Sequence, residues 1–576
     1  MTWLFNNPSD FYSEMMSGFV NANKDFVHPV PGGVIRSTES PKGTVAIVIG
    51  GGAGHYPAFA GYVGQGLAHG AAMGNVFASP SAKQVCTVAR AANNGAGVLL
   101  IFGNYAGDLL HFGLAKEQLN AEGIPCEMVA ITDDISSAPK NEMMKRRGVA
   151  GNLAVFKIAA AAAESGLSLK EVYSIAQKTN DRTRTIGVAF SGCQLPGAEE
   201  ALFTIPDGMM GLGMGIHGEP GISQVAIPTC QQLANVLVEQ LLNELPDGVN
   251  YKEGRLGIIL NGLGTVKYEE LFVLWNEINR NLLEQNITIV DIQIGEFVTS
   301  FDMAGLSLSF IWFDQELEEL WLKPAYSPAF KRGSVLSAPT LALDKYDEYS
   351  RVIIPHATPE SQDTAKLAMA IINEFSNVII NNATKLGDID AVAGDGDHGI
   401  GMERGVRAAR ESAQNSLVCH AGAGTVLRHA ADAWADKAGG TSGAIWGVIL
   451  NTIGAEIGDQ YKPNAQIIAH AISKAASNVM SFGKAQLGDK TLVDVLLPFS
   501  QKLQEEVSKE IPFSQAWSNA AIYADDCAKN TANLLPKVGR ARPHAERSLG
   551  TPDAGAVSLT MIIKATGNCF STFKNT

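Results

Sequence analysis

The stretch TVAIVIGGGAGHYP, residues 44–57, decides the fold of the first half of the chain. It joins a short β-branched apolar run, typical of a buried strand, directly to a glycine-rich turn that carries His55. In α/β proteins, ligands bind at such turns, at the carboxyl ends of parallel strands. The glycine spacing does not fit a dinucleotide fingerprint, and no Gly-Lys-Ser/Thr follows, which excludes a P-loop. The stretch predicts either a tight strand-to-helix turn or a site that grips a small polar substrate through backbone N–H groups and His55.

Further strand-like segments follow within the first 330 residues, and Ala/Leu/Glu-rich helical segments such as 109–121 and 153–165 lie between several of them. This alternation predicts α/β layers with buried parallel strands, in parallel or mixed sheets with flanking helices. Residues 307–313 are available for a second sheet. The predicted strands are 44–49, 97–102, 126–131, 185–189, 255–260 and 288–292.

The character of the chain changes after residue 330. Residues 331–358 are rich in turn formers and show no clear periodicity, which predicts a linker. The rest of the chain, 359–576, is Ala-rich with almost no strand signal, and its amphipathic segments predict an all-α domain closed as a bundle or barrel. The eight predicted helices are 361–382, 403–414, 422–437, 441–457, 464–480, 491–508, 513–533 and 554–567.

The overall composition excludes several classes of function. A chain of 576 residues with 46% apolar and 18% charged residues is typical of a multidomain globular protein. The net charge of -14 argues against a nucleic-acid partner. We expect no membrane span, because no apolar run reaches about 18 residues, and we see no secretory signal. The seven cysteines form no CxxC pair, so we expect reduced thiols in a cytoplasmic protein.

Two more stretches carry candidate catalytic side chains. GNYAGD, residues 103–108, follows another predicted strand, and Asp108 either caps the next helix or accepts a proton from a substrate hydroxyl. In GLGMGIHGEPG, residues 211–221, five glycines surround His217, which predicts either a plain loop or a residue that holds the substrate. If the three stretches converge, His55, Asp108 and His217 suit a neutral carbonyl or polyol better than a phosphate, since no lysine or arginine accompanies them.

An acidic stretch, DIDAVAGDGDHG at residues 388–399, predicts a metal site in the second domain. Asp390, Asp395 and Asp397 fall within eight residues, and such closely spaced carboxylates repel one another unless a cation joins them. A solvated acidic loop or a calcium loop is the alternative, although the EF-hand pattern fails for lack of a Glu at its twelfth position. Three oxygen ligands with open backbone favour Mg²⁺ carrying nucleotide phosphates.

Three later loops combine glycine with hydroxyl or basic side chains at the start of a predicted helix. They cover residues 439–443, 483–491, and 539–542 with 553–556. Helix N-termini attract anions, so several such starts on one rim would cradle a nucleotide. A carbonyl-sized pocket in one domain and a Mg-nucleotide site in the other predict phosphoryl transfer between them.

With these motifs in this order, the chain resembles the ATP-dependent dihydroxyacetone kinase family over nearly its whole length. GGGAGHYP, GNYAGD and GIHGEPG match the family's substrate domain, and VAGDGDHG, GGTSG, GDKT and GRA…DAGA match its nucleotide domain. The resemblance implies a ketose-binding α/β kinase domain over 1–330 and an all-α Mg-ATP-binding domain, similar to an eight-helix barrel, over 359–576. It also implies a homodimer.

The resemblance further implies roles for individual residues. His217 would bond covalently to the ketone carbon as a hemiaminal, His55 would hydrogen-bond to the substrate, and Asp108 would act as base on its terminal hydroxyl. The acidic triad Asp390, Asp395 and Asp397 would hold Mg²⁺ between the phosphates of ATP. The implied substrate contacts are Gly52, Ala53, Gly54, His55, Tyr56, Gly103, Asp108 and His217. The implied nucleotide contacts are His398, Gly399, Ile400, Gly401, Thr441, Ser442, Gly483, Leu492, Arg540, Asp553, Ala554 and Gly555.

Two departures from the family pattern bear on the substrate. Dihydroxyacetone kinases have Gly-His-Glu-Pro where this chain has Gly-His-Tyr-Pro, so Tyr56 replaces a glutamate. They have Lys-Asn-Tyr-Thr-Gly-Asp where this chain has Gly-Asn-Tyr-Ala-Gly-Asp, so Gly103 replaces a lysine. The missing Glu and Lys make the pattern similar to that of the family's erythrulose kinases, so we expect phosphorylation of D- or L-erythrulose. The alternatives are a dihydroxyacetone kinase, a form that takes phosphate from a carrier protein, and a non-catalytic ketose-binding regulator.

Overall fold

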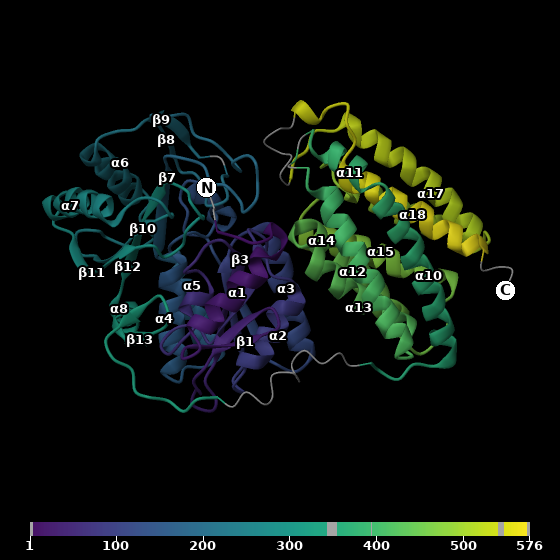
Figure 1. The fold of residues 1–576 in the computed structure, drawn as a ribbon, viewed down its shortest axis with the longest axis horizontal. Helices are drawn as coiled ribbons and strands as arrows, with labels where there is room; N and C mark the ends of the chain where they lie inside the picture. Colours follow the sequence, from purple (N-terminus) through teal and green to yellow (C-terminus); the bar gives the residue numbers. More distant parts are fainter. Residues whose placement is uncertain are drawn as a thin grey trace. The chain divides into compact units, whose positions relative to one another are not determined.

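The computed structural model describes residues 4–219, 221–341, 354–392, 394, 396–538 and 546–572, and for residues 571 and 572 it describes the secondary structure only. The chain divides into two compact units, Met1–Arg351 and Val352–Thr576 (Figure 1). Residues 342–353 of the predicted linker lie outside the described residues, so the domain boundaries stay a prediction.

The first sheet of the first unit has the order β1-β2-β4-β3-β5-β6. Its strands β4, β3, β5 and β6 run parallel to one another, and β1 and β2 add an antiparallel edge. β3 and β5 are buried along their whole length, which explains their continuous apolar runs, because both faces of the sheet are covered. The strands are Val27–Val30 (β1), Gly33–Arg36 (β2), Ala46–Ala53 (β3), Gly70–Val76 (β4), Val98–Gly103 (β5) and Cys126–Ile131 (β6).

The second sheet, β11-β10-β12-β7-β8-β9, is mainly antiparallel. Only β10 and β11 pair in parallel among its described strands, so this sheet is mixed, as the prediction of parallel or mixed sheets allowed. A strand buried on both faces has the same apolar sequence whichever way its neighbours run. The strands are Thr183–Ala189 (β7), Met209–Leu212 (β8), Ser223–Ala226 (β9), Arg255–Gly262 (β10), Thr288–Gly295 (β11) and Gly305–Phe313 (β12), with a small hairpin of Ala325–Tyr326 (β13) and Lys331–Arg332 (β14).

Helix α4, Asn152–Glu164, lies between the two sheets. Its residues 152–163 are all buried, and one core cluster joins them to Ile47 and Ile101 of the first sheet and to Ile259 and Ile311 of the second. Such an all-round apolar helix belongs in a core. α2 and α3 cover the other face of the first sheet, and α6 and α7 cover the outer face of the second. The remaining helix bounds are Phe11–Ala22 (α1), Ala82–Ala92 (α2), Ala106–Ala121 (α3), Leu169–Asp181 (α5), Cys230–Asn243 (α6), Tyr268–Glu284 (α7) and Gln315–Leu322 (α8), with short 3₁₀ turns at Pro8–Asp10, Ala60–Tyr62 and Lys140–Lys145.

In its described residues, 354–392, 394, 396–538 and 546–572, the second unit is a closed ring of eight long helices. Each of them packs against the next in chain order, and α10 contacts both α12 and α18, which closes the ring. The predicted eight-helix barrel is thus confirmed. The helices are Pro359–Asn381 (α10), His398–Val418 (α12), Ala423–Ala438 (α13), Gly440–Ile457 (α14), Ala465–Gly483 (α15), Val493–Ser508 (α16), Phe513–Asn530 (α17) and Ala554–Thr572 (α18), with the short α11, Ala383–Asp390, before the acidic stretch and a 3₁₀ turn at Thr531–Asn533.

Within the described ranges, no helix is both long and apolar enough to cross a membrane. All seven cysteines are free thiols, and Cys86, Cys126 and Cys193 are buried. These three pack as small apolar side chains.

Candidate active site

The three glycine-rich stretches of the first unit meet at one place. His55 lies in the turn after β3, and His217 lies in the loop that joins β8 to the edge strand β9. The Nε2 atoms of these two rings are 2.9 Å apart, although the residues are 162 positions apart in sequence. The predicted convergence of the His55 turn and the His217 loop is therefore present in the structure.

Hydrogen bonds on the far side of each ring fix where the protons of the two histidines lie. Nδ1 of His55 is 2.7 Å from the carbonyl oxygen of Thr299, which can only accept, so this nitrogen carries a proton. Nδ1 of His217 is likewise 3.0 Å from a carboxylate oxygen of Glu219. The 2.9 Å contact between the two Nε2 atoms is then a hydrogen bond only if one proton lies between them. Burial and the charge of His217 lower the pKa of His55 to about 3, so His55 is a neutral ring whose Nε2 atom can accept a proton from its neighbour.

Aromatic rings hold both histidines in place. The ring of Phe77 stacks on His55 at a centroid distance of 4.8 Å and meets His217 edge-on at 5.1 Å. Tyr105 contacts His217 edge-on from another direction, at 4.9 Å. Such contacts add about 0.5–1.5 kcal/mol each and restrict the ring planes. The sequence did not point to Phe77 or Tyr105 as site residues.

Asp108 is buried in the first turn of α3. It is the third helical residue, and Tyr105 occupies the N-cap position, so the alternative that Asp108 caps this helix is wrong. Burial raises the pKa of its carboxyl to about 7, partly offset by a hydrogen bond from Ser79 and the charge of His217. Its Oδ1 atom has no hydrogen-bond partner among the described residues. A buried carboxylate with an open oxygen and a pKa near neutrality suits a general base.

Glu219 and Arg147 belong to the site, and the sequence reasoning missed both. Glu219 binds His217, and Nη1 of Arg147 lies 3.9 Å from Oε2 of Glu219. The expectation that no basic side chain accompanies the histidines was therefore wrong. Glu219 lies two residues after His217 in the same stretch, and this spacing could have indicated a carboxylate that pairs with the histidine. Arg147 follows no motif, and only the fold brings it here.

The residues expected to contact the substrate occupy different environments. Gly52 and Ala53 end β3, and Gly54 has a φ of +99°, where a Cβ would lie 2.7 Å from Phe77 and Phe301. Glycine is required there, since a side chain would be strained and would clash. A Cβ on Gly103 would lie 3.0 Å from the ring of Tyr105.

Tyr56 points to a different place from its neighbour His55. Its side chain is 51% exposed, and its ring packs edge-on against Phe19 of α1 at 6.0 Å. Its main-chain oxygen accepts a hydrogen bond from Thr299 at 2.8 Å. Contact of the Tyr56 side chain with a substrate stays a prediction.

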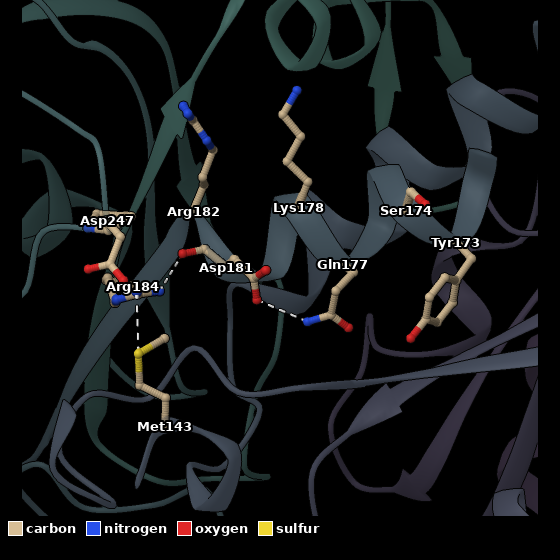
Figure 2. A pocket seen from close by; sticks show the side chains of 10 residues that line it. Met143, Tyr173, Ser174, Gln177, Lys178, Asp181, Arg182, Arg184 and Asp247 are labelled. Carbon is tan, nitrogen blue, oxygen red and sulfur yellow. Dashed lines mark hydrogen bonds between the residues drawn. The ribbon is translucent and has the colours of Figure 1, made fainter. Parts of the chain in front are cut away.

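Figure 2 shows a hollow of about 580 Å³ away from the two histidines, along α5 and the start of β7 of the first unit. Its lining contains none of the residues predicted for the site. Lys178 of this lining pairs with Asp314 and Glu316. Arg184 donates to the main-chain oxygen of Asp181 at 2.9 Å, and its Nε atom has no hydrogen-bond partner among the described residues.

In the second unit, Asp390 ends α11 and Asp397 directly precedes α12. Burial and the neighbouring charge of Asp390 raise the pKa of Asp397, which indicates two carboxylates that repel each other. Asp395 lies outside the described residues. Among the residues that are described, no three His, Cys, Asp or Glu side chains are placed to hold a metal ion. Two oxygen donors next to a third acidic position suit Mg²⁺, and the complete triad stays a prediction.

Several helix starts of the second unit gather beside these carboxylates. His398 lies at the start of α12. Its Nε2 atom is 3.0 Å from Oγ of Ser558 in α18, and its Nδ1 atom is 3.5 Å from Oγ of Ser442 in α14. A Cβ on Gly555 would lie 3.6 Å from the side chain of Leu492, which precedes α16.

The same region holds a carboxyl with a raised pKa and most of the predicted nucleotide contacts. Burial raises the pKa of Asp553 to about 6, opposed by its hydrogen bond from Ala556 and increased by the charge of Asp494. Gly399, Ile400 and Gly401 lie in the first turn of α12, Thr441 in that of α14, and Ala554 begins α18. Gly483 ends α15, and Arg540 lies outside the described part of the chain. Contact of these residues with a nucleotide stays a prediction.

Comparison with known proteins agrees with this two-part arrangement. The Dak1 domain matches residues 17–329, and the DAK2 domain matches residues 392–568. An L-erythrulose kinase of Pectobacterium atrosepticum is 59% identical over 98% of this chain and 96% of its own length. A D-erythrulose kinase of Mycolicibacterium smegmatis is 48% identical over 99% of this chain and 98% of its own length.

Among solved structures, the dihydroxyacetone kinase of C. freundii in complex with AMP-PNP and Mg²⁺ is similar, with a TM-score of 0.52 and 29% identity over 98% of this chain and 99% of that one. The matches span both units in a single alignment. The chain therefore belongs to the dihydroxyacetone kinase family, with a Dak1 domain followed by a DAK2 domain.

Proposed function

We propose that this protein is an ATP-dependent kinase that phosphorylates a terminal hydroxyl of erythrulose. The observation that carries the proposal is the pair of histidines, His55 and His217, whose Nε2 atoms lie 2.9 Å apart. The buried carboxyl of Asp108 belongs to the same unit. An imidazole nitrogen can add to a ketone carbon but not to an alcohol, so this site selects ketoses over polyols of similar size. The erythrulose kinases at 59% and 48% identity support the substrate class.

Phosphoryl transfer needs the ketose domain, 1–330, and the nucleotide domain, 359–576, to act together. His217 holds the ketone as a hemiaminal. Asp108 takes the proton of the ketose's terminal hydroxyl while the oxygen of that hydroxyl attacks the γ-phosphoryl group of ATP. The carboxylates Asp390, Asp395 and Asp397 would hold Mg²⁺. When bound, the ion neutralises charge on the phosphates. The AMP-PNP and Mg²⁺ complex of a related kinase supports this assignment.

Dihydroxyacetone is the alternative substrate. Gly103 favours the longer ketose, because the family's lysine at this position would fill space and add a charge beside the substrate. Relatives that are kinases of L-erythrulose and of D-erythrulose match this chain, so both enantiomers belong in the test. We expect Mg²⁺-dependent ADP formation in a coupled assay, with kcat/KM highest for one erythrulose enantiomer. A higher kcat/KM for dihydroxyacetone would instead support the alternative, and no ADP with any ketose would sink the kinase proposal.

We also propose a cytoplasmic homodimer. The edge strand β9 supports self-association, since its four residues are exposed and Ile222, Val225 and Ile227 expose 42–57% of their surface. Exposed apolar edge strands favour pairing with another chain. The seven free thiols support a reducing compartment. Sedimentation equilibrium should give twice the 61.0 kDa of the chain, whereas a single-chain mass would contradict the dimer.

A further inference from the structure

The loop that carries His217 folds back so that Glu219 binds the same histidine twice. Oε1 of Glu219 lies 3.0 Å from Nδ1 of the His217 ring, and Oε2 accepts a hydrogen bond from the His217 main-chain N–H at 2.9 Å. Burial alone would raise the pKa of Glu219, but His217 and Arg147 lower it below its ordinary value. The carboxylate is therefore ionised and can only accept hydrogen bonds.

Arg147 holds Glu219 from behind. Its guanidinium lies 3.9 Å from Oε2 of Glu219, donates to Asp134 at 2.9 Å, and donates to the main-chain oxygen of Gly213 at 3.1 Å. The segment before Arg147 is fixed in turn, since Asn104 of the GNYAGD stretch donates to the main-chain oxygen of residue 146 at 2.7 Å. Two of the glycine-rich stretches are thus connected through the adjacent residues Arg146 and Arg147.

Gly215 provides the space for this arrangement. A Cβ at this position would lie 2.1 Å from Oε2 of Glu219 and 2.5 Å from Nη1 of Arg147, both far inside contact distance. Gly215 therefore allows the side chains of Glu219 and Arg147 to approach the backbone beside His217. This space lies behind the histidine and is separate from any space that the loop leaves for a ketone.

We infer that Glu219 is a positioning residue for His217: it keeps a proton on Nδ1, so that Nε2 is the nitrogen that becomes free to bond the ketone. Arg147 keeps the carboxylate ionised and in place. This inference rests on the proposed ketose capture by His217. A neutral histidine without such a partner would hold its proton on either nitrogen. The form with the proton on Nε2 cannot attack a carbonyl carbon through this atom, because Nε2 then has no free lone pair.

The capture step balances with the groups at hand. The proton that lies between the two Nε2 atoms moves to Nε2 of His55, which leaves a lone pair on Nε2 of His217. This lone pair forms the bond to the ketone carbon, the π pair of the carbonyl group moves to its oxygen, and that oxygen takes the proton from His55. The His217 ring of the adduct is an imidazolium with its proton on Nδ1, and the net charge of the site does not change. Glu219 faces this positive ring, which stabilises the adduct.

The test uses the full-length chain and the variant Glu219→Gln, which keeps the size of the side chain and removes its charge. Glu200→Gln is the matched control, since it makes the same change at an exposed position of the same unit. Gly215→Ala is a second variant, because it leaves every acid in place and displaces Glu219. The probe is [2-¹³C]dihydroxyacetone, whose labelled carbon changes from a ketone to a tetrahedral resonance in the ¹³C NMR spectrum when the adduct forms.

We expect Glu219→Gln and Gly215→Ala to weaken adduct formation at least about tenfold and to raise KM for the ketose in parallel. KM for ATP and the melting temperature of Glu219→Gln should stay close to wild type, as they should for Glu200→Gln. A merely structural role would change these two quantities instead. Adduct formation by Glu219→Gln with wild-type affinity would overturn the inference.

A second readout separates this inference from the proposed function. In protein labelled with ¹⁵N-histidine, the His217 ring, assigned with the variant His217→Ala, should carry a proton on Nδ1 in the wild type and lose it in Glu219→Gln. If the wild type forms no adduct with any ketose, covalent capture fails, and the ¹⁵N spectra still decide the role of Glu219. Identical His217 protonation in both proteins would overturn that role.

Discussion

The two ligand regions of this protein differ in how much of their charge the protein balances by itself. In the ketose region, each histidine has a partner behind it, Thr299 for His55 and Glu219 for His217, and Arg147 faces two carboxylates. In the nucleotide region, Asp390 and Asp397 repel each other, and burial raises the pKa of Asp553 to about 6. The proposed site for a neutral ketose is organised in advance, whereas the repelling carboxylates at the proposed Mg-ATP site suit a cation that joins them.

The largest effect should come from Asp108, a buried carboxyl whose Oδ1 atom has no hydrogen-bond partner among the described residues. Asp108→Asn removes the base while keeping the shape of the side chain, so kcat should fall by about 10²–10⁴-fold in steady-state assays. The Kd for the ketose should change little, because His217 still captures it. A kcat within threefold or so of wild type would show that no general base is needed here.

On the nucleotide side, Asp390→Asn should weaken Mg²⁺ binding and leave the ketose side unchanged. The apparent affinity for Mg²⁺, measured by titrating the metal in the ADP assay, should fall at least about tenfold. Asp388→Asn is the matched control, since Asp388 is an exposed acid two positions away. Equal effects of the two substitutions would indicate a general charge effect rather than a metal ligand.

Gly103 tests how far the ketose pocket is fixed by packing. Gly103→Lys restores the family's usual residue and forces a side chain past Tyr105, so the ratio of kcat/KM for erythrulose over dihydroxyacetone should fall about tenfold. Gly103→Ala introduces only the Cβ and separates crowding from the added amine. An unchanged ratio in Gly103→Lys would place substrate selection elsewhere in the pocket.

The smallest expected effect is on stability. Because the pKa of Asp108 is raised to about 7 in the folded state, the folded protein binds more protons than the unfolded chain between about pH 4 and pH 7. This group therefore lowers stability as pH rises through that window. Asp108→Asn should melt higher than wild type at pH 8, by on the order of a few degrees, and no higher at pH 4. Calorimetry giving the same difference at both pH values would contradict the raised pKa.

The sequence predicted the layers and the barrel well, because continuous apolar strands and amphipathic helices leave strong local patterns. It also predicted that His55 and His217 would meet, from glycine-rich turns at strand ends. It could not predict strand direction in the second sheet, since a buried strand has the same pattern either way.

Contacts made by distant parts of the chain were likewise out of reach. Nothing near Arg147 in the sequence indicates that it faces Glu219, because α4, α5, β7 and β8 lie between the two residues. Asp108 looked like a helix cap because Asp suits that position, but the helix starts two residues earlier, at Ala106. Burial of Asp108, which gives the residue its chemical interest, depends on packing of the whole unit.

Covalent capture of a ketone by His217 is the central claim, and the most direct measurement compares Kd for erythrulose with Kd for erythritol, the polyol that lacks only the carbonyl group. Isothermal titration calorimetry on wild type and His217→Ala gives all four values. The wild type should bind erythrulose at least about tenfold more tightly than erythritol, a difference of about 1.4 kcal/mol. In His217→Ala the two ligands should bind alike. A preference for erythrulose that survives unchanged in His217→Ala would contradict covalent capture.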